Sequence, residues 1–301
     1  MKENDVDVVI VNYNAGDILL ECVKKIIKNI PNLIIIVDNN SSDSSLGLCE
    51  QQLSGIQNIR IIKNSKNIGF AAACNVGMLE TKGDAVLFLN PDCLIEPNVI
   101  ELLYQVLTSD KSVGMVGGML LNVDGSEQAG GRRAVPTPWR SFVRAFGLAR
   151  FSQRWPRLFC DFNLCKQPLP KQQIEVEALS GACIMVKRKA VEEIGLWDEG
   201  YFLHCEDIDW CMRFRKKQWK VMFVPSAKII HIHGACSKNN KIFVEWHKHK
   251  GMMRFYRKFF RHQYPGALMW LVAVGVWLRF GVVSSAIYAK QILKRIGFSR
   301  D

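Results

Sequence analysis

Short apolar runs alternate with helical patterns over the first ninety residues, and this alternation limits the fold more than any other feature. Each run is about five residues long and almost wholly apolar, as in parallel strands buried on both faces of a sheet. The runs are Val6–Val11, Leu33–Val37, Ile59–Lys63 and Ala85–Leu89. Helical spacing of apolar residues separates them at Ile18–Ile30 and Gly69–Thr81. We therefore predict an α/β fold with a doubly wound, mostly parallel sheet.

A polar cluster follows each predicted strand directly. The clusters are Asn12-Tyr13-Asn14, Asp38–Asp43, Asn64–Phe70 and Asn90-Pro91-Asp92. Each cluster alone is also typical of an ordinary turn or helix cap. In a doubly wound sheet, however, ligands bind beyond the carboxyl ends of the strands. Four clusters at that one edge therefore predict a ligand-binding site.

Six motifs, in order along roughly residues 6–237, carry a family resemblance. They are VVIVNYNAGDILLECV, IIIVDNNSSDSS, NSKNIGFAAACNVGM, VLFLNPDCLIEPNVI, LSGACIMVKRKAVEEIGLWDEGYFLHCEDIDWCMRFR and VPSAKIIHIHGACS. The series resembles the family 2 glycosyltransferases, which are inverting enzymes of the GT-A fold. It is most similar to the bacterial rhamnosyltransferases of O-antigen and cell-wall polysaccharide assembly. The resemblance implies a nucleotide diphosphate sugar as donor and Mg²⁺ or Mn²⁺ as cofactor.

The resemblance assigns the donor to the polar clusters. Asp38 would accept a hydrogen bond from the base, and the helix after Gly69 would favour an anionic group with its N-terminal amides. Arg132 and Arg133 resemble a family RR pair near the donor and would meet phosphate. The donor-binding residues implied in this way are Asn12, Asn14, Asp38, Asn39, Ser41, Asp43, Asn67, Gly69, Phe70, Asn75, Asn90 and Arg132.

The triplet Asn90-Pro91-Asp92 stands where the family has its DxD motif. Mg²⁺ and Mn²⁺ prefer oxygen ligands, commonly one or two carboxylates plus substrate phosphates. The resemblance therefore makes Asp92 a metal ligand and His231 a further one, with His233 as the weaker choice. A plain Asn-Pro-Asp turn and a hydrogen-bonded structural histidine are the alternatives.

Glu206 and Asp207 match the ED motif of the family. An inverting transfer needs a base for the acceptor hydroxyl, and a carboxylate serves if its pKa suits. By the resemblance Asp207 is this base, and Glu206 orients it or substitutes for it. We expect the motif to open a helix, and a purely acidic helix cap is the alternative. The residues expected near the acceptor are Trp197, Asp198 and Trp210.

Charge is distributed unevenly along the chain. The formal net charge is +12, yet residues 1–130 carry −7, residues 131–171 carry +8 and residues 241–301 carry +10. This pattern disfavours a nucleic-acid binder, which would be basic over its main domain. We predict a glycosyltransferase domain at 1–240, which includes a basic, aromatic acceptor or membrane insertion at 131–175. A membrane-association tail follows at 241–301.

Within the tail, an apolar stretch runs from Gly266 to Ala289 with Arg279 as its only charge. That length suffices to span a bilayer. Basic residues flank it on both sides, however, whereas a spanning helix normally shows charge asymmetry. We therefore favour one or two helices lying in the plane of an anionic membrane surface. A single span and a soluble helix pair are the alternatives.

Cysteine usage and the N-terminus favour the cytoplasmic face of the bacterial inner membrane. The ten cysteines show no zinc spacing, and the polar first residues do not resemble a signal peptide. The resemblance predicts transfer of L-rhamnose from dTDP-L-rhamnose to a polyprenyl-diphosphate-linked or polysaccharide acceptor. A UDP-sugar donor (galactose, glucose or N-acetylhexosamine) and an inert scaffold in a polysaccharide assembly complex are the alternatives. A homodimer stays open.

Overall fold

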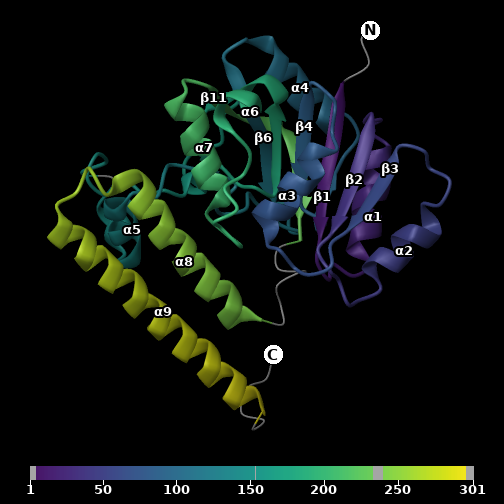
Figure 1. Ribbon diagram of the computed structural model, residues 1–301. Coiled ribbons are helices and arrows are strands. Elements are labelled where there is room, and N and C mark those ends of the chain that lie inside the picture. The colour runs from purple at the N-terminus through teal and green to yellow at the C-terminus, as the bar shows by residue number, and fades with distance from the viewer. Residues whose placement is uncertain (1–4, 153, 233–239, 296–301) are drawn as a thin grey trace.

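The computed structural model describes residues 5–152, 154–232 and 240–295. Its first four strands are parallel and form one side of the central sheet. Their order is β3-β2-β1-β4. The strands are β1 (Val6–Asn12), β2 (Leu33–Asp38), β3 (Ile59–Lys63) and β4 (Ala85–Leu89). The pairing of Asn12 with Asp38 brings the carboxyl ends of β1 and β2 to one edge (Figure 1).

Beyond β4 the sheet becomes mixed. β10 lies antiparallel between β4 and β6, β11 runs parallel to β6, and β5 and β8 pair antiparallel with β11. β7 and β9 form a separate ribbon. The bounds are β5 (Cys93–Ile95), β6 (Val113–Leu121), β7 (Arg132–Arg133), β8 (Ile174–Glu175), β9 (Ala178–Leu179), β10 (Cys183–Lys187) and β11 (Lys220–His231). The predicted α/β fold with a mostly parallel sheet is confirmed.

Helices cover both faces of the sheet because successive strand side chains point in opposite directions. Val8 and Ile10 of β1 share a core with α1 (Ile18–Ile27), α2 (Ser45–Gln52) and α4 (Val99–Ser109). Val9 and Val11 share the opposite core with the helices of the other layer. Those helices are α3 (Phe70–Leu79), α6 (Arg188–Ile194) and α7 (Glu206–Lys216). Each core is thus closed by its own layer of helices, as the doubly wound prediction requires.

Two helices are shorter than the sequence pattern suggests. The helix expected over Ile18–Ile30 ends at Ile27, and Ile30 has φ +52°, which a right-handed helix does not accommodate. The helix expected to begin at Gly69 begins at Phe70, because Gly69 has φ +89°. A Cβ atom at Gly69 would lie 2.8 Å from the Phe202 carbonyl oxygen. Glycine therefore allows this turn to approach the loop before α7.

The basic segment and the tail form a helical layer beside the sheet (Figure 1). It contains α5 (Pro138–Ala145), the short 3-10 helices η1 (Leu148–Phe151) and η2 (Leu164–Lys166), α8 (Lys241–Phe260) and α9 (Gly266–Arg295). The tail thus forms two helices. Gly266–Leu293 within α9 is long and apolar enough to cross a membrane, and only 6% of its most apolar window is buried. The Arg279 guanidinium lies 3.0 Å from His249 Nε2 of α8, so the one charge of Gly266–Ala289 faces the neighbouring helix.

α8 belongs to the core of the catalytic body. Its residues Met253, Phe255 and Phe259 are buried in the same cluster as Trp210 and Phe214 of α7. The expected division at residue 240 therefore runs between elements that share a core, and α9 is the element that projects from the rest.

The nine cysteines within the described ranges are free thiols. Seven are buried, while Cys160 and Cys165 are partly exposed. Cys236 lies outside the described residues.

Candidate active site

Side chains after β1 and β2 form a closed hydrogen-bond network at the carboxyl edge of the sheet. Asn12 Nδ2 donates to Asp38 Oδ1 at 2.7 Å, to Ser41 Oγ at 3.0 Å and to Ser45 Oγ at 2.9 Å. The Ser41 amide donates to Asp38 Oδ2 at 3.0 Å. Asn12 and Asp38 are buried. They therefore fix the two strand ends to one another from below the edge.

The loops after β1 and β2 are joined by a second set of contacts. Asn14 Oδ1 accepts from the Ser42 amide at 2.7 Å and from the Asp43 amide at 3.3 Å. The Gly16 amide donates to Asp43 Oδ2 at 2.8 Å. Asn14 is partly exposed and Asp43 is exposed. These two predicted donor residues thus lie on the open side of the edge.

Asn39 connects these loops to the start of α3. Its Nδ2 donates to Asn67 Oδ1 at 2.9 Å and to the Gly69 carbonyl at 3.2 Å, and its Oδ1 accepts from the Ile68 amide at 3.1 Å. Asn39 is buried. The amide of Phe70 donates to the Phe202 carbonyl at 2.8 Å. The predicted residues Asn39, Asn67, Gly69 and Phe70 are therefore brought together.

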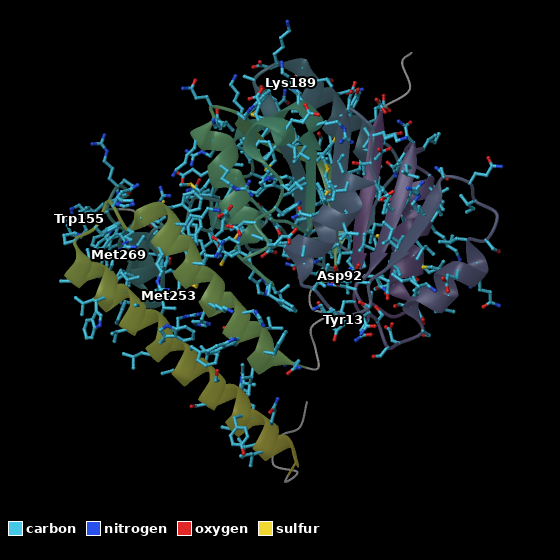
Figure 2. All side chains as sticks on the ribbon, in the orientation of Figure 1. Tyr13, Asp92, Trp155, Lys189, Met253 and Met269 are labelled. Carbon is cyan, nitrogen blue, oxygen red and sulfur yellow. The ribbon has the colours of Figure 1, made fainter. Side chains whose placement is uncertain are left out.

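Asp92 lies at the same edge of the sheet as Tyr13 (Figure 2). His231 ends β11 and pairs in register with Cys93, so its ring comes 3.3 Å from Asp92 Oδ1 through Nε2. The buried Asp92 Oδ1 accepts no hydrogen bond within the described part of the chain. Cys93 is the third residue of this group, but its Sγ turns to the Ala182 carbonyl. His233 lies outside the described residues.

Gln128 determines which nitrogen of His231 faces Asp92. Gln128 Nε2 donates to Asn122 Oδ1 at 3.1 Å and to the His231 carbonyl at 3.2 Å. Its Oε1, 2.6 Å from His231 Nδ1, must therefore accept. With the proton on Nδ1, the lone pair of Nε2 faces a carboxylate oxygen. Two acceptors at that spacing fit a divalent cation between them.

The segment Ser180–Ala182 joins the two expected reaction centres. The Asn90 amide donates to the Ala182 carbonyl at 2.9 Å, and Asn90 is partly exposed. One residue earlier, the Gly181 amide donates to Asp207 Oδ2 at 3.1 Å. The Asp92–His231 pair and the Glu206–Asp207 pair thus adjoin neighbouring residues of one turn.

Glu206 and Asp207 open α7, as the sequence predicts. Cys205 and His204 before them both adopt left-handed backbone conformations, with φ +71° and +67°. Two consecutive left-handed residues without glycine are uncommon and cost free energy. This turn directs the two carboxylates toward different surroundings.

Those surroundings separate the pKa values of the two carboxyl groups. Burial, reinforced by the neighbouring Asp207 charge, raises the pKa of Glu206 to about 8. Burial alone would also raise the pKa of Asp207, but Arg133 and the amides of Gly181 and Ile208 hold it below its usual value. At neutral pH the pair therefore contains a neutral Glu206 beside an ionised Asp207.

Arg133, and not Arg132, reaches this pair. Its Nη2 donates to Asp207 Oδ2 and, at 3.0 Å, to the Leu179 carbonyl. Arg132 is buried, and its Nε and Nη2 donate to the Glu127 carboxylate at 2.7 Å and 3.1 Å. The expectation that Arg132 contacts phosphate is therefore wrong for this structure, because adjacent strand residues point in opposite directions.

Asn75 is a structural residue. Its Nδ2 donates to the Trp197 carbonyl at 3.0 Å and to Glu199 Oε1 at 2.8 Å, and its Oδ1 accepts from the Trp197 amide at 3.0 Å. The side chain is buried. It fastens the segment before α7 to α3, so it does not line the donor pocket as expected.

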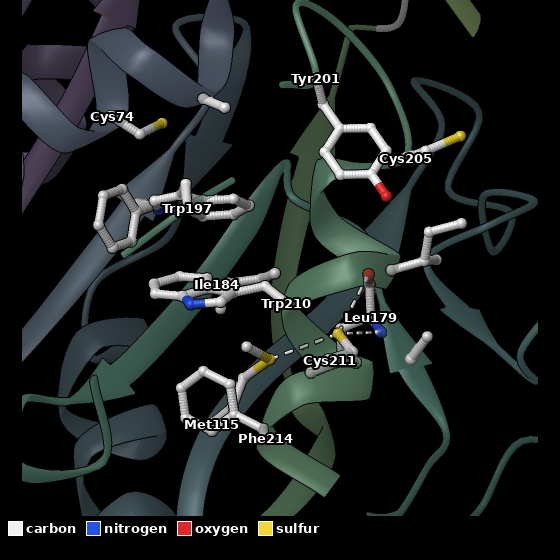
Figure 3. Close-up of a cluster of buried hydrophobic side chains, with 14 of the residues drawn as sticks. Cys74, Met115, Leu179, Ile184, Trp197, Tyr201, Cys205, Trp210, Cys211 and Phe214 are labelled. Carbon is white, nitrogen blue, oxygen red and sulfur yellow. Dashed lines mark hydrogen bonds between the residues drawn. The ribbon is translucent and has the colours of Figure 1, made fainter. Parts of the chain in front are cut away.

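The three residues expected near the acceptor make contacts within the fold. Trp197 and Trp210 are buried in the cluster of Figure 3, with ring centroids 4.1 Å apart. Asp198 forms ion pairs with Arg254 at 2.8 Å and Lys258 at 2.6 Å of α8. These contacts lower the pKa of Asp198 to about 2 against the opposing effect of burial. The aromatic core and the α8 contacts thus account for these residues.

Two residues of the site were missed by the sequence analysis. Gln128 belongs to no motif, because its role depends on contact with His231 of β11, about a hundred residues further along the chain. Arg133 was expected to meet phosphate together with Arg132, but not to contact Asp207. Neighbouring residues of a strand point in opposite directions, so knowing that Arg132 pairs with the buried side would have directed Arg133 to the site. No sequence motif, however, marks Glu127 as the partner of Arg132.

Comparison with known proteins agrees with this geometry. Residues 7–195 match the family model of glycosyl transferase family 2. An N-acetylglucosaminyl-diphospho-decaprenol L-rhamnosyltransferase of Mycobacterium tuberculosis is 29% identical over 212 residues, which cover 67% of this chain and 66% of that protein. The rhamnosyltransferase WbbL of Escherichia coli K12 is 24% identical over 259 residues, covering 80% of this chain and 88% of that protein. The chain thus spans about two thirds of the length of the mycobacterial relative.

A solved structure shares the fold. The mannosyltransferase of Pyrobaculum calidifontis in complex with GDP-Man and Mn²⁺ superposes with a TM-score of 0.57 at 15% identity, covering 97% of this chain and 80% of that one. The GT-A architecture expected from the motifs is therefore confirmed. With the family model matched over more than half of its length, this chain belongs to glycosyl transferase family 2 and is a glycosyltransferase.

Proposed function

We propose that the protein transfers L-rhamnose from dTDP-L-rhamnose to a lipid-linked diphosphate acceptor with inversion at the anomeric carbon. The observation that carries this is the turn Ser180–Ala182, which contacts Asn90, two residues before Asp92, through the Ala182 carbonyl and Asp207 through the Gly181 amide. The rhamnosyltransferase relatives support the choice of sugar. The decaprenol-linked substrate named for the mycobacterial relative supports the choice of acceptor.

The donor would lie across the loops after β1, β2 and β3. The base and ribose would contact Asn14, Ser41 and Asp43, which are accessible at the edge. Asn12, Asp38 and Asn39 would position these loops from below through their buried network. Among the described residues, each Asp38 carboxylate oxygen accepts one hydrogen bond, so the group keeps acceptor capacity for the base.

Asp92 and His231 would hold the divalent cation, Mg²⁺ or Mn²⁺, which supplies charge neutralisation for the departing nucleotide diphosphate. Their donor set of a carboxylate oxygen and an imidazole nitrogen fits this group. The Mn²⁺ in the mannosyltransferase complex supports the assignment. Asn90, fixed by its amide to Ala182, would contribute its side chain to the donor instead of the cation.

Asp207 would accept the proton of the acceptor hydroxyl as that oxygen attacks the anomeric carbon. A carboxylate ionised at neutral pH has the protonation state that this step requires. Glu206, with its raised pKa, would remain neutral and so would not compete for the proton. It would therefore assist Asp207 by its position and not act as a second base.

The acceptor would be reached from a membrane surface. α9 exposes apolar side chains such as Trp270 and Leu278, and the segment around α5 exposes Trp139, Phe142 and Phe146 among arginines. Apolar faces with basic residues favour binding in the plane of an anionic leaflet. We propose a peripheral position on the cytoplasmic face of the inner membrane.

A donor panel tests this proposal. Purified protein is given dTDP-rhamnose, UDP-galactose, UDP-glucose or UDP-N-acetylglucosamine with Mg²⁺ or Mn²⁺ and a lipid-diphosphate N-acetylglucosamine acceptor. The released nucleotide diphosphate is measured. We expect dTDP-rhamnose to be preferred and the variants Asp207→Asn and Asp92→Asn to lose at least about a hundredfold in kcat, as for loss of a positioned base or electrostatic group. Preference for another donor overturns the sugar assignment, and no release from any donor favours an inert scaffold.

A further inference from the structure

Arg133 has a free donor beside the proposed base. It is the last residue of β7, and its side chain is 18% exposed. Nη2 is engaged by Asp207 and the Leu179 carbonyl, whereas the buried Nε finds no hydrogen-bond partner among the described residues. Nε–H and an Nη–H of a guanidinium point along one edge and together match two oxygens of a phosphate or carboxylate. Only half of that edge is used here.

Asp207 is unsuited to take a proton while Arg133 holds it. Its oxygens accept from the Gly181 amide at 3.1 Å and the Ile208 amide at 2.8 Å in addition to the guanidinium. Donors and a cation favour the ionised form and so weaken the group as a base. The other titratable groups that face Asp207 are His204 and Cys205 in the preceding turn and Glu206 and Cys211 on α7. None of these four groups is a permanent cation, whereas Arg133 is.

The chemistry of the proposed acceptor places an anion next to the base. In a sugar linked to a lipid through a diphosphate, the attacking hydroxyl and the first phosphate belong to the same hexose. A hydroxyl that reaches Asp207 therefore brings phosphate oxygens within one sugar ring of it. A guanidinium that contacts Asp207 and keeps a free Nε–H fits such an oxygen pair.

We propose that the acceptor diphosphate binds Arg133 and draws it from Asp207, so that acceptor binding itself releases the base. This rests on the proposed function, because it assigns Arg133 a role in that reaction. The hydroxyl proton then passes to Asp207, and the hydroxyl oxygen forms the bond to the anomeric carbon. The bond from that carbon to the nucleotide diphosphate breaks, and its electron pair leaves with the diphosphate. Without an acceptor, Asp207 stays paired and water is not activated.

Two acceptors test this coupling. One is N-acetylglucosaminyl-diphospho-farnesol, and the other is octyl N-acetylglucosaminide, which carries the same sugar without phosphate. Initial rates give kcat/KM for wild type, Arg133→Gln and Arg133→Lys, and nucleotide diphosphate release without acceptor measures donor hydrolysis. We expect Arg133→Gln to lower the preference for the diphosphate acceptor by about tenfold or more, as for one charge-assisted contact, and to raise donor hydrolysis. Arg133→Lys should keep part of the preference.

The pH profile with the octyl glycoside separates this role from a merely structural one. Because Arg133 holds the pKa of Asp207 down, its removal should move the acidic limb of kcat/KM to higher pH. Arg60→Gln is the matched control: it removes another arginine–carboxylate pair, with Glu80, outside the site. It should leave both the acceptor preference and the acidic limb unchanged.

The outcomes are distinct. An unchanged acceptor preference and acidic limb in Arg133→Gln overturn the inference while leaving the transferase activity in place. A wild-type protein that releases no nucleotide diphosphate from any donor overturns the proposed function instead. If Arg133→Gln does not fold, the comparison rests on Arg133→Lys, for which full wild-type preference and pH profile with both acceptors would overturn a role that depends on the planar guanidinium.

Discussion

The ammonium group of Lys258 lies 2.6 Å from the buried carboxylate of Asp209. Lys258 belongs to α8 and Asp209 to the first turn of α7, two residues after the proposed base. The same ammonium is 2.6 Å from Asp198. α8 is therefore ion-paired directly with α7, the helix that presents Glu206 and Asp207.

Removing this lysine should destabilise the protein. In Lys258→Ala the buried Asp209 keeps the Arg213 guanidinium at 2.7 Å and the Tyr201 hydroxyl at 3.1 Å but loses one cation. We expect a loss of about 1–3 kcal/mol in the free energy of unfolding, less than for a fully orphaned buried charge. Urea unfolding measures it. Arg257→Ala, an exposed charge on the same helix, is the control, and equal losses in both variants would contradict the role of the ion pair.

Gly251 sets the approach of α8 to the strained turn. A Cβ atom there would lie 2.8 Å from the His204 carbonyl oxygen and 3.3 Å from Cys205 Cβ. We expect Gly251→Ala to shift α8 or the turn, lowering kcat and the midpoint of thermal unfolding. Gly275→Ala in α9 is the matched control, because a Cβ there meets open space. It should gain about 0.5–1 kcal/mol from helix propensity, and a gain in both variants would show that the contact at Gly251 is unimportant.

Gln128 should influence metal affinity without touching the metal. Gln128→Leu removes the acceptor that holds the proton on His231 Nδ1. Loss of such an orienting partner typically costs 10–100-fold in affinity, and we expect about that for Mn²⁺. Titration followed by electron paramagnetic resonance measures it. Gln128→Glu keeps an acceptor and should retain most of the affinity. A Leu variant that binds Mn²⁺ as tightly as wild type would contradict this arrangement.

Stability should depend on pH through Glu206. Because its pKa is raised from about 4.5 to about 8, the folded state holds a proton that the unfolded state loses. Its contribution is thus fully present below pH 4.5 and is lost as pH rises toward 8. The side chain in Glu206→Gln stays neutral at every pH. We therefore expect the free energy of unfolding of the variant, relative to that of wild type, to increase between pH 5 and pH 8 in urea unfolding. Glu192→Gln, on the exposed surface of α6, should show no such trend. A constant difference for Glu206→Gln would contradict the raised pKa.

The outer face of α9 should bind anionic vesicles. Leu278 and Val282 are 65% and 71% exposed. We expect Leu278→Glu combined with Val282→Glu to reduce sedimentation with phosphatidylglycerol vesicles by at least about tenfold, because two buried apolar contacts are replaced by repelled charges. Ile30→Glu combined with Leu79→Glu changes equally exposed residues of the catalytic body. A similar loss in that pair would assign the effect to net charge alone.

The fold was predictable because its signals are local. Buried parallel strands are recognisable as apolar runs, and the polar loops follow at a fixed edge whatever the rest of the chain does. The ends of α1 and α3 were misplaced because they depend on positive φ at Ile30 and Gly69, and neither follows from apolar spacing.

The site was predictable only where a motif names the residue. Asp92 follows β4 and Asp207 lies at the start of α7, but Trp210 lies one helical turn beyond Asp207 and is nevertheless buried. Whether it faces a ligand depends on Trp197 and Phe88, which pack against it from other elements. Likewise, Arg132 and Arg133 differ only in which side of a two-residue strand they occupy. Such choices are made by tertiary packing, which a single sequence does not display.

The inclusion of α8 in the core also bears on synthesis of the chain. Phe255 and Phe259 are part of the core. The core is therefore incomplete until these residues have left the ribosome, since chains fold from the N-terminus as they emerge. The exposed, apolar α9 is the next segment to appear. Completion of the core and emergence of the apolar face of α9 therefore occur at nearly the same stage of synthesis. That face has little time to bind other molecules before the core is complete.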